Sequence, residues 1–138
     1  VMAKDANGIL SLSGTATYTA FTLDTQTMDT LNEFDGSVFT AISAGEYFAC
    51  INGTMVPNDT LKTGGLGVIK NGVLGSDYAI SGYLSTSGIT PDGVLFSACG
   101  NFTLGVGDTL TLVYTCDDTT GSDNCALNDP KFSLFRQW

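Results

Sequence analysis

Residues 36–52 read GSVFTAISAGEYFACIN, the densest run of apolar and aromatic residues in a chain otherwise rich in Thr, Gly and Asp. Phe39–Ile42 and Glu46–Ile51 have the apolar, β-branched and aromatic content of strands. Between them Ser43-Ala44-Gly45 is expected to form a turn that uses the backbone freedom of Gly45. The stretch therefore predicts two strands joined by a tight turn, with their apolar side chains in a core.

Strand patterns continue on both sides of this stretch. In TATYTAFTL, residues 15–23, Thr alternates with apolar residues, which predicts a half-buried strand. Asn71-Gly72 is a strong hairpin signal after residues 67–70. Further strands are expected at residues 78–84, 94–104, 109–116 and 131–138. No long amphipathic helix is indicated, so we predict one all-β domain over residues 1–138, with residues 1–9 as an extended N-terminal arm.

Composition narrows the possible partners. The chain has 138 residues and a formal net charge of −9, with only 5 Lys and Arg against 14 Asp and Glu. Nucleic acids and anionic membrane surfaces are bound through Lys and Arg, so neither is an expected partner. The N-terminus lacks the layout of a signal peptide. Two explanations stay open: a signal already removed, or a translation start at Met2 of a protein never exported by that route.

Four cysteines, at positions 50, 99, 116 and 125, form no Cys-x-x-Cys pair, and the chain has no His. A zinc or haem site of the usual kind is therefore not indicated. Cys116 and Cys125 bracket the polar segment DDTTGSDN, and we predict a disulfide between them in an oxidising compartment. Cys50 and Cys99 lie in apolar strands and are either linked across strands or buried as free thiols.

Few residues suggest chemistry. Without His, catalytic triads of the Ser-His and Cys-His types are excluded. The acidic loop with Asp117, Asp118 and Asp123 supplies oxygen atoms of the kind calcium prefers, although its spacing differs from an EF-hand. No other cofactor is expected.

Asn58, Asn52 and Asn101 each begin an Asn-x-Thr glycosylation pattern. Asn58 is the most loop-like of the three. Asn52 shares its strand phase with Cys50, and Asn101 with Cys99. If these cysteines face the core, both asparagines are expected to be buried.

Four segments together resemble a known family. FTAISAGEY is similar to the hallmark of the globular head domain of the complement component-one q subcomponent, a branch of the tumour necrosis factor-like jelly rolls. The matching positions are Phe39, Thr40, Ala41, Gly45 and Tyr47. The other similar segments follow in family order: Gly67 to Gly72 with its Lys-Asn-Gly, Leu104 to Leu110 with Gly107-Asp108, and Phe132 to Phe135. Ser37, Ile42, Ala49 and Leu134 depart from the family pattern.

The resemblance implies a jelly-roll β-sandwich of about eight to ten antiparallel strands that assembles as a homotrimer. Aromatic residues would then either pack at the three-fold interface or fill the core of each subunit; the candidates are Phe39, Tyr47, Phe48, Phe132, Phe135 and Trp138. Phe48 lies one residue early relative to the family pattern, and so on the opposite strand face.

The expected function is a non-enzymatic head domain for extracellular recognition, adhesion or assembly, with a protein or glycan ligand bound by loops 53–65, 85–93 and 117–130. The alternative is a virion surface protein, such as a capsid decoration protein or tail-fibre tip, whose partners are neighbouring virion subunits. A carbohydrate-active enzyme is disfavoured, because the carboxylates cluster in polar turns.

Overall fold

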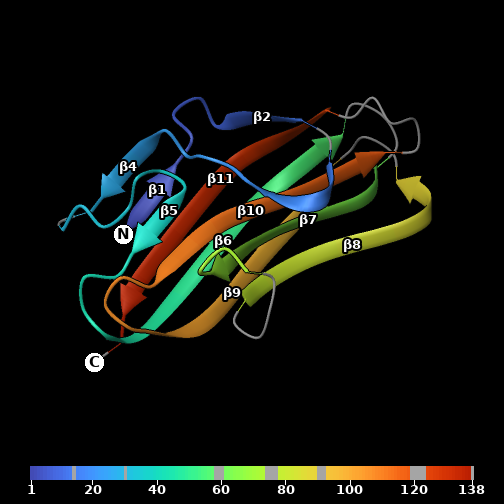
Figure 1. The fold of residues 1–138 in the computed structure, drawn as a ribbon. Coiled ribbons are helices and arrows are strands. Elements are labelled where there is room, and N and C mark those ends of the chain that lie inside the picture. Colours follow the sequence, from blue (N-terminus) through green and yellow to red (C-terminus); the bar gives the residue numbers. More distant parts are fainter. Residues whose placement is uncertain are drawn as a thin grey trace.

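The computed structural model describes residues 1–13, 15–29, 31–57, 61–73, 78–89, 93–118 and 124–137. The described residues form eleven strands in two antiparallel sheets that face each other as a sandwich (Figure 1). The six-stranded sheet has the order β4-β1-β11-β6-β9 with β2 beside β11, and the five-stranded sheet has the order β3-β10-β7-β8 with β5 beside β10. The strand bounds are β1 Met2–Lys4, β2 Ile9–Ser13, β3 Thr15–Ala20, β4 Thr25–Met28, β5 Val38–Thr40, β6 Gly45–Pro57, β7 Leu61–Lys70, β8 Tyr78–Ile89, β9 Val94–Leu104, β10 Thr109–Asp118 and β11 Asn124–Arg136.

The prediction of an all-β jelly roll is confirmed, with one more strand than the upper bound of ten. The extra strands are short and lie near the N-terminus: β1, for example, has three residues and lies between β4 and β11. The described part of the chain contains no helix with the length and hydropathy needed to cross a bilayer.

Strand β6 shows how the core forms. Its residues alternate strictly between buried and less buried, so Tyr47, Ala49, Ile51 and Met55 point toward the opposite sheet. Apolar residues of the facing strand β10, including Leu110 and Leu112, complete the same core. Burial of this apolar surface is the main source of stability in a sandwich of this kind.

The opening stretch forms two strands, but these belong to different sheets. β5 pairs with β10 in the five-stranded sheet, whereas β6 pairs with β9 and β11 in the six-stranded sheet. The connecting residues 41–44 therefore cross from one sheet to the other. The expectation that Gly45 supplies turn freedom is wrong, because Gly45 already begins β6 and does not have a positive φ. A Cβ at Gly45 would lie 2.7 Å from Nε of Arg136, so a larger residue there would require the flexible Arg136 side chain to move.

Strand β11 carries a bulge that lets the N-terminal segment follow it along its length. Residues before the bulge pair with β2 and residues after it pair with β1, and the register on β6 shifts between Asn128 and Lys131. Asp129 in the bulge has a φ of 49° and donates its amide to the carbonyl oxygen of Gly8 at 2.6 Å. The bulge thereby fixes where β1 ends and β2 begins.

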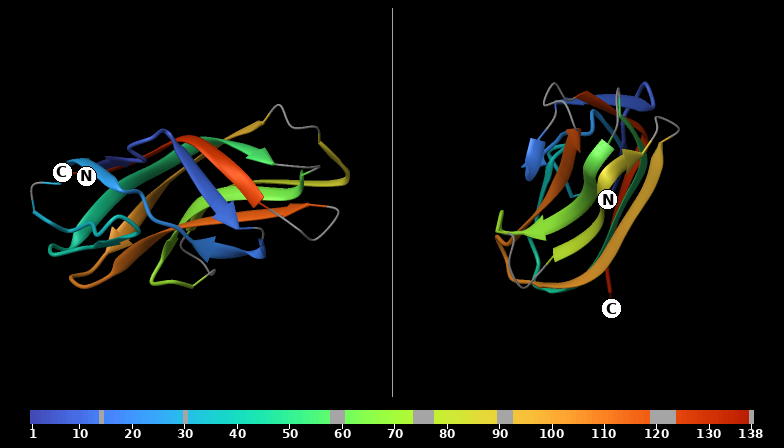
Figure 2. Two further views of the ribbon diagram at one scale, coloured as in Figure 1. Left: turned by 90° about the horizontal axis from the view of Figure 1, so that it is seen from above. Right: turned by 90° about the vertical axis from the view of Figure 1, so that its right-hand side faces the viewer.

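Both cysteine pairs are disulfides, which confirms the predicted Cys116–Cys125 bond and decides the open question at Cys50 and Cys99. The Cys116–Cys125 bond joins β10 to β11 and therefore connects the two sheets. The Cys50–Cys99 bond joins the neighbouring strands β6 and β9 within one sheet. The two ends of the chain lie at the same end of the sandwich (Figure 2), where the amino group of Val1 donates to the carbonyl oxygen of Leu134 at 2.7 Å.

Candidate functional site

The outward side of the six-stranded sheet carries exposed apolar side chains in positions that face away from the core. We call this surface the outer face and define it by Met2, Met28, Phe48, Cys50, Cys99, Leu95, Ser133 and Phe135. Met2 is 48% exposed, Met28 57% and Phe135 55%. Large apolar side chains gathered on one surface of a monomer often mark an interaction site.

Strand register places the residues of the outer face in adjoining rows. In one row Met28 lies opposite Met2, Met2 opposite Ser133, Ser133 opposite Cys50, and Cys50 opposite Cys99. In the next row Phe135 lies opposite Phe48, with their ring centroids 5.3 Å apart. Together the two rows cross β4, β1, β11, β6 and β9, whereas Leu95 lies apart from them, opposite Thr54 on β6.

The predicted aromatic candidates divide between the core and the outer face. Phe39, Tyr47 and Phe132 are buried in the core, where Phe39 contacts Tyr47 and Phe132 contacts Phe34. Phe48 and Phe135 point outward, as the shifted position of Phe48 suggests. Trp138 lies outside the described residues.

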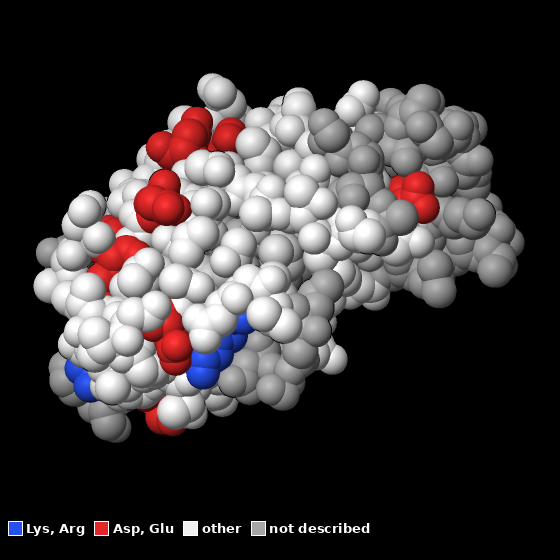
Figure 3. Space-filling view, in the orientation of Figure 1, with Lys and Arg blue, Asp and Glu red and all other residues white. Residues whose placement is uncertain are grey.

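The outer face has fewer acidic residues relative to basic ones than the chain as a whole, whose net charge is −9. Lys4 lies opposite Lys131 beside the apolar rows, which places two of the chain's five basic residues together. Along β4, β1, β11, β6 and β9 as the structure describes them, the acidic residues are Glu46 at one end of β6 and Asp129 in the bulge of β11, two residues from Lys131. Figure 3 shows the opposite side of the molecule, over the five-stranded sheet, where most of the described acidic side chains in view lie over the half that carries β5. An acid-poor surface lets two acidic chains approach with less repulsion.

A cavity of about 210 Å³ opens beside the outer face, near the chain termini. Its floor includes Tyr47, whose hydroxyl donates to the carbonyl oxygen of Ser43 at 2.7 Å. Burial raises the pKa of the Tyr47 hydroxyl, and the Glu33 carboxylate adds to the effect. Glu33 is the only carboxylate among the described residues that line the cavity.

Residues of the Lys-Asn-Gly and Gly-Asp motifs form hydrogen bonds between the turn after β7 and the turn before β10. Asp108 accepts hydrogen bonds from the amide of Gly105 at 2.8 Å and from Nδ2 of Asn71 at 3.1 Å, and it forms an ion pair with Lys70 at 3.3 Å. Asn71 in turn accepts the amide of Thr109 at 2.8 Å. Asn71 and Gly72 both have positive φ, as a type I′ turn requires. The Lys-Asn-Gly and Gly-Asp motifs thus join two turns of the sandwich.

We predict that Asp108→Asn lowers the free energy of unfolding at neutral pH and makes the free energy of unfolding less dependent on pH in the acidic range. The amide of Gly105, with smaller contributions from Asn71 and Lys70, holds the pKa of Asp108 below its ordinary value. A lowered folded-state pKa stabilises the fold above the unfolded pKa of about 3.9, and this contribution is lost as pH falls through the lower folded value. Urea midpoints measured from neutral pH to below about pH 4 should fall less steeply for the variant. If the urea midpoints of the wild type and the variant fall equally steeply with pH, Asp108 does not stabilise the turn.

The predicted calcium ligands are not assembled by the described residues. Asp117 lies at the end of β10 and is half-buried, only the backbone of Asp118 is described, and Asp123 lies outside the described residues. Within the described part of the chain, no three His, Cys, Asp or Glu side chains are grouped so as to hold a metal ion. Calcium binding stays a prediction.

Whether the glycosylation candidates are accessible depends on the side of the sheet on which their side chains lie. Cys50 and Cys99 point outward, so Asn52 and Asn101 do as well, and neither is fully buried. Asn101 accepts a hydrogen bond from Nε2 of Gln137 at 2.9 Å. Asn58 lies outside the described residues. A glycan on Asn52 or Asn101 would occupy the outer face, so glycosylation there and close packing of this face exclude each other.

Sequence reasoning missed Met2, Met28 and Leu95 as members of the outer face. Leu95 could have been found, because it is the one large apolar residue at the outward positions of β9, which otherwise hold Ser97, Cys99, Asn101 and Thr103. Met2 and Met28 come together only through the pairing of β1 with β4, which the sequence pattern does not reveal.

The comparisons with known proteins agree with this architecture. No family model and no curated protein matches the chain by sequence. Among solved structures, it is similar to the globular domain of the zebrafish complement 1qA protein, with a TM-score of 0.60 and 13% identity over 99% of this chain and 95% of that chain. It is also similar to the Eiger tumour necrosis factor from S. frugiperda, with a TM-score of 0.57 and 13% identity over 99% of this chain and 90% of that chain. The chain therefore has a jelly-roll fold of the complement-q and tumour necrosis factor-like type.

Proposed function

We propose that this protein is a non-enzymatic, homotrimeric head domain that acts outside the cell, and that its subunits associate through the outer face. The observation that carries the proposal is the continuous apolar surface formed by Met28, Met2, Phe135 and Phe48 across neighbouring strands. The family resemblance implies three copies, and a closed ring of three covers the surface in every subunit.

The charge distribution supports association through this side of the molecule. A chain of net charge −9 repels its copies, and repulsion is least where acidic groups are few. Lys4 and Lys131 beside the apolar rows offer cations to acidic groups of a neighbouring subunit. The outer face therefore combines apolar area with favourable electrostatics.

Recognition of a protein or glycan ligand is assigned to the end of the sandwich away from the termini. Strands β6, β8 and β10 all end there, and β7, β9 and β11 begin there (Figure 1). The three segments expected to be loops are largely strand in the structure, and residues 58–60, 90–92 and 119–123 lie outside the described residues. Two disulfides are typical of proteins in an oxidising compartment, which supports a place outside the cell.

The three methionines of the chain provide a test of the proposal. Met2 and Met28 lie on the outer face, whereas Met55 is fully buried in the core. Association should protect Met2 and Met28 from oxidation by dilute hydrogen peroxide, because their sulfur atoms become covered. Mass spectrometry of peptides should show slower oxidation of both as protein concentration rises, with Met55 slow throughout. If Met2 and Met28 react equally fast at all concentrations, the outer face is not the interface.

A further inference from the structure

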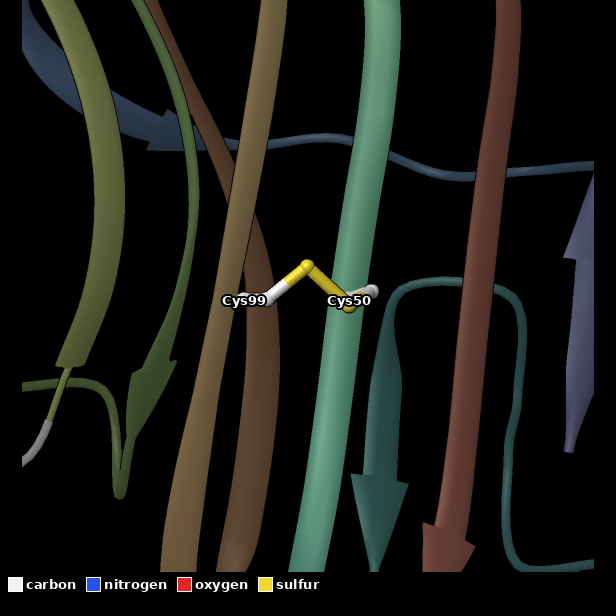
Figure 4. The surroundings of a disulfide bond; sticks show 2 residues. All are labelled: Cys50 and Cys99. Atoms are coloured by element: carbon white, nitrogen blue, oxygen red, sulfur yellow. A yellow bond between two sulfur atoms is a disulfide. The ribbon is translucent and has the colours of Figure 1, made fainter.

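The two disulfides of this protein lie in opposite environments. Cys116 and Cys125 are 1% and 3% exposed, between the two sheets. Cys50 and Cys99 lie directly opposite each other on the outer face, with their Cα atoms 4.1 Å apart (Figure 4). Cys99 is exposed and Cys50 is half-buried. One bond is therefore shielded by the fold, and the other is open to solvent in a single subunit.

This difference decides which bond a thiol reductant can attack. A thiolate must reach a sulfur atom, so a buried disulfide reacts only after the protein opens locally. A dithiol reductant attacks the sulfur of Cys99, forms a mixed disulfide and releases Cys50 as a thiolate, which takes up a proton. The second thiol of the reductant then closes a disulfide with the first and releases Cys99. Two electrons pass from the dithiol to the protein, which gains two protons.

Neighbouring residues favour this reaction at Cys50. Ser133 lies opposite Cys50 on β11, and Lys131 lies two residues from Ser133 on the same strand and the same side of the sheet. A long side chain in this diagonal position lies within reach of Cys50. A nearby ammonium group stabilises the thiolate that leaves.

The Cys50–Cys99 bond also lies within the surface assigned to assembly. It ends the row that begins with Met28 and Met2, and it borders the row of Phe135 and Phe48. Reduction would separate the two sulfur atoms to van der Waals distance and add two polar S–H groups at this position. A neighbouring subunit packed on the oxidised face would no longer fit equally well.

We propose that Cys50–Cys99 is a redox switch coupled to assembly: association shields this disulfide from dithiols, and its reduction weakens association. The proposal rests on the proposed function, because the coupling requires the outer face to be the interface. Linkage makes the two effects reciprocal, so the factor by which reduction weakens association equals the factor by which association disfavours reduction.

Partial reduction with dithiothreitol, followed by iodoacetamide labelling and peptide mass spectrometry, tests the proposal. In a Phe48→Asp variant kept monomeric, Cys50 and Cys99 should be labelled at least about tenfold faster than Cys116 and Cys125, because only the latter pair requires local opening. In the wild-type protein, labelling of Cys50 and Cys99 should slow as concentration rises and assembly proceeds. Equal labelling of the two pairs in the monomer would overturn the assignment of the switch.

A second variant measures the reverse effect. Cys50→Ser combined with Cys99→Ser should keep the fold, because Cys116–Cys125 still joins the sheets, and should require a higher protein concentration for half-assembly than the wild type. A trimeric wild type with concentration-independent labelling of Cys50 and Cys99 would overturn the coupling and leave the proposed function standing. A wild type that is monomeric at all concentrations would overturn both the proposed function and the coupling.

Discussion

Replacing Phe48 with aspartate is expected to convert the proposed trimer into a folded monomer. The ring of Phe48 is half-buried against Phe135 on the outer face, so its replacement does not open the core. In the assembled protein the same position would place an unpaired carboxylate in an apolar interface in each of three subunits. Burying such a group costs several kcal/mol, and every ~1.4 kcal/mol weakens association about tenfold.

Light scattering after size-exclusion chromatography should give the variant the 14.4 kDa mass of one chain, with the β-sheet circular dichroism spectrum preserved. Val106→Asp is the matched control, because Val106 is 73% exposed in the turn between β9 and β10 and does not belong to the outer face. It should keep the wild-type mass. A folded Phe48→Asp protein that stays trimeric would place the interface elsewhere.

Alanine substitutions of two phenylalanines that lie three residues apart on β11 are expected to differ strongly in their effect on the free energy of unfolding. Phe132 is 2% exposed and its ring centroid lies 5.1 Å from that of Phe34, whereas Phe135 is 55% exposed on the opposite side of the sheet. Phe132→Ala leaves a cavity in the core and should lower the free energy of unfolding by about 3–5 kcal/mol. Phe135→Ala removes an exposed ring and should cost less than about 1 kcal/mol.

Both substitutions should be made in the Phe48→Asp background, because the apparent stability of an oligomer depends on protein concentration. Urea unfolding followed by fluorescence then reports on one subunit alone. In an otherwise wild-type chain, Phe135→Ala should instead weaken association. Similar unfolding free energies for the two variants would contradict the division of these aromatic residues between core and outer face.

The jelly-roll fold could be predicted because its signals are local. Alternation along single strands indicates strands, and four short motifs in order indicate the family of folds. What could not be predicted is how strands combine. β5 and β6 are close in the sequence yet lie in different sheets, since their partners β10 and β11 come from the far end of the chain. No local pattern contains that pairing.

The side on which each residue of β6 lies was also difficult to predict, because this strand has apolar residues in both phases. Tyr47, Ala49 and Ile51 form the core side, while Phe48 and Cys50 form the outer side. A strand of the usual half-exposed kind would carry polar residues in one phase. Because both phases are apolar, the sequence alone leaves open which side of the sheet Cys50 faces. The same apolar second phase marks the outer face as a contact surface.

Whether the outer face joins three subunits is decided by the mass of the wild-type protein in solution, measured by light scattering over a series of concentrations. This mass should rise to three times the 14.4 kDa of one chain, and Phe48→Asp should have the mass of a single chain. A wild-type mass of one chain at every concentration would contradict association through the outer face.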